Sequence, residues 1–141
     1  MFKLRVTEPW HRDDFSAKGT GRTHIRAWSP KDEPRISADA ADACAKAAER
    51  LSSAVEALAA APAPLDARQK ENVADLLACA RYLRDKTISL REQYLAQLDL
   101  IAGDREEAAG RLRQALALEE SFDGIGVAPC RRWLAQITAT V

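Results

Sequence analysis

The chain has 141 residues, enough for one domain, and its 21 Lys and Arg residues equal its 21 Asp and Glu residues in number. The resulting net charge of zero excludes a globally basic nucleic-acid-binding protein and an acidic disordered tail. The sequence is 47% hydrophobic and has 28 alanines, 26 of them after Ile36, so it has the apolar content for a core and the composition of a helical protein.

Targeting and redox signals in the sequence favour the cytoplasm. No apolar run is long enough to cross a membrane, and the N-terminal segment is too polar for a signal peptide. Cys44, Cys79 and Cys130 are far apart and form no CxxC motif, so neither a disulfide framework nor a zinc knuckle is expected. We expect all three to be small buried side chains in a reducing compartment, with Cys130, which precedes two arginines, as the candidate for a reactive thiol.

The composition changes near Ile36 and divides the chain into an N-terminal arm and linker (1–36) and a helical bundle domain (37–141). The arm carries both histidines, four of the eight aromatic residues and a net charge of +3, against −3 for the remainder. Apolar and basic residues alternate over Phe2–Val6, which predicts a short strand, and residues 29–34 predict an extended linker. We expect the arm to be extended or to form a short hairpin, and to lie across the helices through its aromatic side chains.

The first two expected helices are separated by prolines. Ser37 is expected to cap a helix from Ala38 to about Ala61. A capping-box pattern at 66–69 then begins a long helix from 67 to about 102. Its apolar residues keep a spacing of four and three, and we expect this stripe to be buried: Leu76, Ala80, Leu83, Thr87, Leu90, Tyr94, Leu98 and Ile101.

Two shorter helices complete the expected bundle. Gly103 is expected to end the long helix with a positive φ, and Asp104 to cap a helix that ends near Glu120. Pro129 suits the first turn of a last helix. Charged residues of the long helix are expected to form a solvated face: Arg81, Arg84, Asp85, Lys86, Arg91 and Glu92. The predicted fold class is therefore mainly α, an up-down bundle of about four helices preceded by an extended or short-β arm.

Residues 89–122 resemble a single tetratricopeptide repeat, a helical hairpin with small and large apolar residues at fixed places. The matching positions are Leu95, Ala96, Gly103, Asp104, Ala108, Leu112, Ala115 and Leu116. In that family the first helix of the hairpin lines the ligand groove. The resemblance implies the partner-binding positions Gln93, Gln97, Leu100 and Ile101. Because such arrays need about three repeats, the hairpin belongs either to a separate kind of bundle or to a larger array.

The arm holds the residues that could carry chemistry, but no complete set. His11 and His24 with two neighbouring carboxylates are too few for a metal site, and residues 18–23 have the glycines of a phosphate loop in the wrong order. We predict no catalytic set, no metal and no cofactor. The arm candidates for recognition are Trp10, His11, Arg12 and Trp28.

The sequence favours a non-catalytic protein-interaction or scaffolding module that binds a protein or peptide and acts without a membrane. One alternative is an accessory helical domain of an enzyme, whose active site the arm helps to complete. A second is nucleic-acid contact through the basic and aromatic residues of the arm, which the charge balance does not favour. The sequence does not decide whether the chain forms a homo-oligomer.

Overall fold

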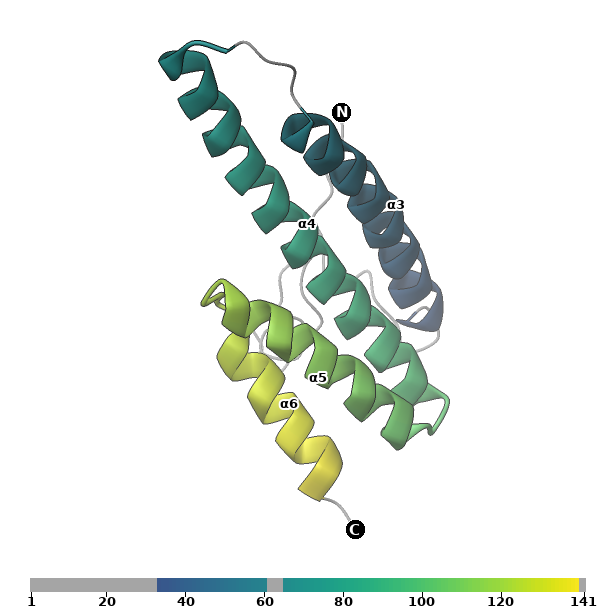
Figure 1. The fold of residues 1–141 in the computed structure, drawn as a ribbon. Helices are drawn as coiled ribbons and strands as arrows, with labels where there is room; N and C mark the ends of the chain where they lie inside the picture. The colour runs from purple at the N-terminus through teal and green to yellow at the C-terminus, as the bar shows by residue number, and fades with distance from the viewer. Residues whose placement is uncertain (1–32, 61–64, 140–141) are drawn as a thin grey trace, which may run out of the picture.

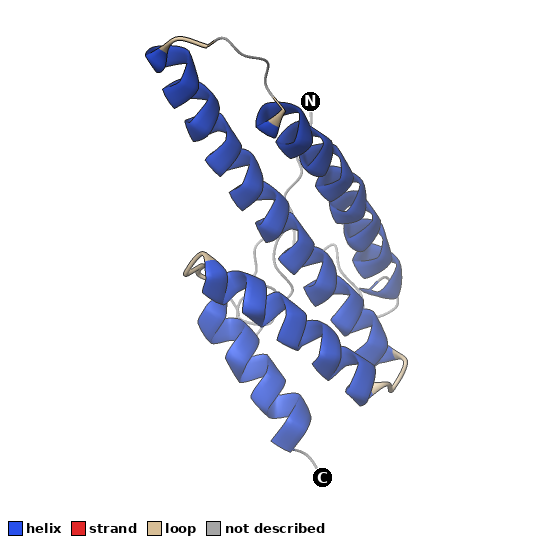
Figure 2. Ribbon diagram, viewed as in Figure 1, coloured by secondary structure: helices blue, strands red, loops and turns tan. Residues whose placement is uncertain are grey.

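A computed structural model describes residues 33–60 and 65–139, and this part of the chain is mainly helical. The described residues form four α-helices and no strand (Figures 1 and 2). They are α3 (Glu33–Ala59), α4 (Ala67–Ile101), α5 (Arg105–Ser121) and α6 (Val127–Ala139). Almost all of the N-terminal arm lies outside the described residues, and so do its strand and hairpin predictions.

Helix α3 begins earlier than the sequence indicated. It starts at Glu33, so Pro34 belongs to its first turn and Ser37 is a fully buried residue inside the helix. The predictions of a linker over 29–34 and of a cap at Ser37 are therefore wrong where they concern residues 33–37. The reason is that proline is tolerated in the first turn of a helix, where its missing N–H has no intrahelical acceptor.

Helix α4 is the central element, because α3 and α5 both pack against it (Figure 1). Its N-terminal capping box is confirmed: the Asp66 carboxylate accepts from the backbone N–H of Gln69 at 2.7 Å, and the Gln69 side chain accepts from the backbone N–H of Asp66 at 3.0 Å. The helix then runs 35 residues without a break, as predicted. In Figure 1, its first turns extend beyond α5, and of the described helices α3 lies beside them.

Two apolar clusters hold the helices together. In the first, Ala41 and Cys44 near the start of α3 contact Tyr94 in the second half of α4, so α3 and α4 are antiparallel. In the second, the buried Ala96 of α4 and Ala108 and Leu112 of α5 contact Leu100 of α4 and three apolar side chains of α6: Trp133, Leu134 and Ile137.

The turns follow the sequence signals closely. Gly103 has φ +85°, as predicted, and the Asp104 carboxylate accepts from the backbone N–H of Glu107 at 3.1 Å to cap α5. Pro129 lies in the first turn of α6 and is buried. Within the described residues no helix is long and apolar enough to cross a membrane.

The predicted burial of the α4 stripe is wrong along one edge. Ala80 and Tyr94 are buried, but Leu76 is 58% exposed and Leu83 and Ile101 are each 50% exposed. Helix α3 packs on Tyr94, with Leu90 and Leu95 beside it. Helix α5 covers a different side of α4, whose buried residues are mostly polar or small.

Candidate functional site

Along one side of α4, apolar side chains are exposed towards the two ends of the helix. Leu76, Leu83, Leu90 and Gln97 recur every seven residues, so they share one side of the helix, and Ile101 continues the line. Cys79, which is also exposed, lies beside them. We call this surface the open face of α4, made up of Leu76, Cys79, Leu83, Leu90, Gln97 and Ile101. Leu90 and Gln97 are partly buried, and Leu90 packs against the cluster of Ala41, Cys44 and Tyr94. The face is therefore exposed only towards its two ends.

The loop between α5 and α6 borders α4 near its middle. The rings of Tyr82 and Phe122 meet edge to face with centroids 5.1 Å apart, which fixes the end of α5 against α4. Three residues later, Ile125 is 74% exposed, the highest exposure among the large hydrophobic residues of the described chain. The loop that adjoins α4 therefore carries an exposed apolar residue of its own.

Beneath this loop, a buried polar cluster joins α4 to α5. The fully buried Glu119 carboxylate of α5 accepts at one oxygen, Oε1, from Lys86 Nζ at 2.6 Å and from Ser89 Oγ at 2.9 Å. Gln93 Nε2 donates to Ser89 Oγ at 3.2 Å. Glu119 Oε2 and Gln93 Oε1 are buried without a hydrogen-bond partner in the structure. Burying a charge is costly unless it is paired, so the ion pair with Lys86 offsets the cost of burying the Glu119 carboxylate.

Two glycines after α5 leave room for this carboxylate. A Cβ placed on Gly126 would lie 2.7 Å from Glu119 Cδ, and one placed on Gly124 would overlap Glu119 Oε2. Only residues without a side chain fit at these positions while Glu119 stays in place. The Gly124–Gly126 loop is therefore shaped around the buried charge.

A second ionic cluster lies closer to the hairpin turn. Arg111 of α5 contacts Asp99 at 2.7 Å and Glu92 at 3.3 Å, both on α4, and Arg91 also pairs with Glu92 at 3.1 Å. Burial lowers the pKa of the Arg111 guanidinium, but the hydrogen bonds and charges of Asp99 and Glu92 outweigh burial and leave the pKa raised. This cluster keeps Arg111 charged and ties α5 to α4.

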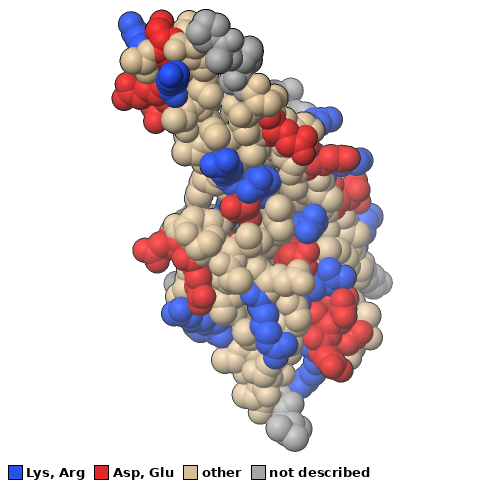
Figure 3. Space-filling model, in the orientation of Figure 1, with Lys and Arg blue, Asp and Glu red and all other residues tan. Residues whose placement is uncertain are grey.

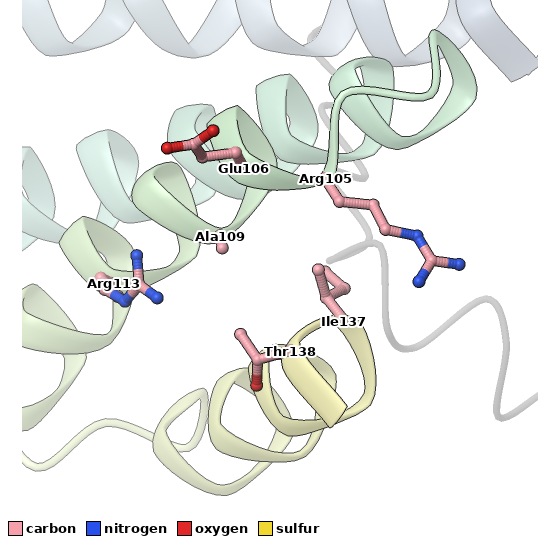
Figure 4. Close-up of a pocket in the computed structure, with 6 residues that line it drawn as sticks. All are labelled: Arg105, Glu106, Ala109, Arg113, Ile137 and Thr138. Atoms are coloured by element: carbon pink, nitrogen blue, oxygen red, sulfur yellow. The ribbon is translucent and has the colours of Figure 1, made fainter. Parts of the chain in front are cut away.

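The open side of the α5–α6 pair holds a shallow pocket of about 350 Å³. Figure 4 shows Arg105 and Arg113 at its two ends, with Ile137 and Thr138 of α6 between them. Glu106 and Ala109 complete the lining. The mixed charges and small apolar floor form no arrangement of nucleophile and base.

Neither ionic cluster has the composition of a reactive centre. Both consist of carboxylates paired with Lys or Arg, which hold helices together. Among the described residues no three His, Cys, Asp or Glu side chains are grouped so that they could hold a metal ion. On the face seen in Figure 3, acidic and basic side chains are interspersed.

The positions implied by the tetratricopeptide resemblance separate into two groups. Gln97 and Ile101 lie on the open face of α4, where Ile101 is 50% exposed. Gln93 is fully buried in the Glu119 cluster, and Leu100 packs against the cluster that contains Trp133, so a partner could not reach Gln93 in this arrangement. The arm candidates Trp10, His11, Arg12 and Trp28 lie outside the described residues.

The three thiols differ more than expected. Cys130 is fully buried, which removes it as a reactive candidate, and burial raises the pKa of the Cys44 thiol to about 11 despite the opposing charge of Arg91. Cys79 is exposed, so the expectation of three buried cysteines is wrong for this one. It lies on the part of α4 that extends past α5.

Sequence reasoning missed the buried polar cluster. Lys86 and Glu92 were assigned to a solvated face, but Glu92 is 5% exposed and Lys86 pairs with the fully buried Glu119. A weak signal was present: Ser89 and Gln93 are four residues apart and therefore lie on one side of α4. Because both residues are polar, the sequence did not indicate that this side of α4 is buried.

Comparisons with known proteins found no relative of this chain. No family model matches the chain, and neither a curated protein nor a solved structure matches it. The tetratricopeptide resemblance of residues 89–122 therefore stays a prediction.

Proposed function

We propose that this chain is a non-catalytic protein-interaction module whose partner binds the open face of α4. The observation that carries the proposal is the exposure of Leu76, Leu83 and Ile101 along one side of an unbroken helix. Apolar residues exposed singly are ordinary, but apolar residues exposed along one side of a helix are the pattern by which a helix docks into a partner's groove.

The exposed leucines of this face can contribute a measurable part of a binding energy. Covering the exposed half of one leucine side chain removes roughly 80 Å² of apolar surface from water, worth about 2 kcal/mol at the usual coefficient. Leu76 and Leu83 alone would then contribute about 4 kcal/mol before the cost of association. Ile101 and Ile125 are further exposed apolar residues.

A tetratricopeptide-like role for residues 89–122 is part of the proposal. Ala96 of α4 and Ala108 of α5 are both fully buried where these helices meet, which is the kind of close contact that small residues allow in such hairpins. Gln97 and Ile101 then represent the groove positions that a partner can reach. We also propose a cytoplasmic location, which suits the free thiols of Cys44, Cys79 and Cys130.

The proposal is tested with two matched double variants of the full chain. Leu76→Glu/Leu83→Glu places charges on the open face, and Ala74→Glu/Ala78→Glu places the same charges on exposed positions on the opposite side of the helix. Each is used to capture partners from cells of the source organism. A captured protein is then purified, and its complex is mapped by amide hydrogen exchange.

We expect the wild type and the Ala74→Glu/Ala78→Glu variant to bind a partner that the Leu76→Glu/Leu83→Glu variant loses. Both variants should keep a wild-type melting temperature within a few degrees, because all four side chains are exposed. Binding should also slow exchange along α4. Equal capture by both variants would refute the proposal.

A further inference from the structure

We propose that the buried polar cluster of Glu119, Lys86, Ser89 and Gln93 holds the far end of α5 at one position on α4, and that this is its role instead of adding stability. The inference concerns the conformation of the chain and does not depend on the partner at the open face of α4. Three observations carry it: the composition of the cluster, the composition of the remaining contact between the two helices, and the place of the cluster along α5.

The composition of the cluster favours a specific conformation over stability. The Glu119 carboxylate and the Gln93 amide are fully buried, and Glu119 Oε2 and Gln93 Oε1 have no hydrogen-bond partner among the described residues. Moving a charge out of water is costly, and apolar side chains in place of a buried ion pair often leave a protein equally or more stable. A buried acceptor without a partner adds to that cost. Stability alone therefore does not explain why these residues are polar.

The apolar contact between α4 and α5 consists mainly of small side chains. The buried residues of α5 are Ala108, Ala109, Leu112, Ala115 and Glu119. On α4, the fully buried Ala96 belongs to the same cluster. Apolar burial has no preferred direction, so a contact of this kind restrains the angle of α5 only weakly. Hydrogen bonds restrain it more, because donor and acceptor must lie within about 3 Å of each other and in line.

The cluster lies at the end of α5 that the hairpin turn does not hold. The turn at Gly103 holds the start of α5, and the ion pair of Arg111 with Asp99, at 2.7 Å, ties the first half of α5 to α4. Glu119 lies in the last turn of α5, roughly 21 Å from the first residue of the helix. Over that length, a tilt of about 15° at the turn would move the Glu119 carboxylate by about 5 Å. Such a movement would break its hydrogen bonds of 2.6 and 2.9 Å.

The loop after α5 is arranged around the same residue. The backbone N–H of Gly124 donates to the carbonyl oxygen of Glu119 at 2.8 Å, and a Cβ at Gly126 would lie 2.7 Å from Glu119 Cδ. The Phe122 ring, which contacts Tyr82, belongs to the same short segment. This loop leads into α6, and α6 packs against α5. A displacement of Glu119 would therefore also displace α6.

Two matched double variants separate position from stability. Lys86→Met/Glu119→Met replaces the buried ion pair with two unbranched apolar side chains of similar length. Glu120→Met/Arg131→Met removes an ion pair of 2.9 Å that is exposed and involves the next residue of α5. Lys86→Met alone leaves the buried carboxylate without the cation that contacts it, and should lower Tm by roughly 10 °C or more.

The position of α5 is measured by electron paramagnetic resonance on the full chain. In a Cys79→Ser background, nitroxide labels are attached to Ser53→Cys on α3 and Ala117→Cys in the second half of α5, both exposed positions. Cys44 and Cys130 are buried and stay unlabelled. Pulsed measurements give the distribution of distances between the two labels, and thermal denaturation of the same variants gives Tm.

We expect the wild type and Glu120→Met/Arg131→Met to give one narrow distance distribution. Lys86→Met/Glu119→Met should give a distribution at least about twice as wide, while its Tm stays within about 5 °C of the wild type or rises. A narrow distribution in this variant would show that other residues determine the position of α5, and would overturn the inference. A fall in Tm as large as that of Lys86→Met, or a failure to fold, would show that the cluster is needed for stability and would overturn it as well.

Discussion

Gly126→Ala tests the buried carboxylate that joins α4 to α5. A Cβ at this position would lie 2.7 Å from both Cδ and Oε1 of Glu119, well inside van der Waals contact. The carboxylate cannot move aside freely, because Oε1 is held by Lys86 at 2.6 Å and by Ser89 at 2.9 Å. The substitution therefore forces a choice between shifting the loop and breaking these bonds.

The expected loss of stability follows from the hydrogen bonds and the packing that the added Cβ would disturb. Hydrogen bonds to charged groups contribute about 1.5–3 kcal/mol each, and overpacking a filled site costs about 1–3 kcal/mol. Because relaxation will recover part of this, we expect Gly126→Ala to lower the free energy of unfolding by about 2–4 kcal/mol. For a chain of this length that corresponds to a fall of roughly 6–14 °C in Tm. Thermal and urea denaturation followed by circular dichroism at 222 nm would measure both quantities.

A double-mutant cycle shows whether Glu119 is the cause. In a Glu119→Ala background the obstructing carboxylate is absent, so Gly126→Ala should cost less than about 1 kcal/mol. Gly103→Ala is a useful contrast, because its cost of about 1 kcal/mol comes from φ +85° and should not change with Glu119. A loss below about 0.5 kcal/mol for Gly126→Ala in the wild type would refute the placement of the carboxylate.

Three further predictions use the same denaturation experiments. Gly110→Ala should raise stability by up to about 1 kcal/mol, because the helical position has open space for a Cβ, and any destabilisation would contradict this. Leu83→Ala should cost less than about 1 kcal/mol and Leu112→Ala about 2–5 kcal/mol, because Leu83 is 50% exposed and Leu112 is fully buried. The reverse order would place Leu83 in the core. The stability advantage of the wild type over Cys44→Ala should be constant below about pH 9 and shrink towards pH 11. The reason is that the pKa of the Cys44 thiol is raised to about 11 in the folded chain, so the thiol of the unfolded chain ionises first. An advantage that grows with pH would contradict the burial of Cys44.

Local signals were sufficient to predict three of the four helices closely. Asp66 and Gln69 determine the start of α4, and Gly103 with Asp104 determines the turn into α5, because capping bonds and a positive φ involve only neighbouring residues. The start of α3 was missed because Pro34 suits a linker and a first helical turn equally well. That choice depends on what buries Ser37 in the folded chain, which neighbouring residues do not encode.

The candidate site could be predicted only in part. The four-and-three spacing correctly identified the apolar line from Leu76 to Ile101, but it contains no information about how many helices cover it. The position of α5 is determined by side chains distant in sequence, above all by Glu119 meeting Lys86 and Ser89. A lone glutamate near a helix end gives no sign of this pairing.

Along α4, polar side chains are buried and leucine side chains are exposed, the reverse of the usual arrangement. Ser89 and Gln93 are fully buried against α5, while Leu76 and Leu83 remain half exposed on the same helix. A core built only for stability would place the leucines inside, because a buried polar pair gains little over water and a buried leucine gains about 2 kcal/mol. The cost of this inversion is explained if the polar cluster fixes where α5 stops and thereby keeps the first half of α4 available for a partner. Loss of Glu119 should then change binding at the open face of α4 as well as stability.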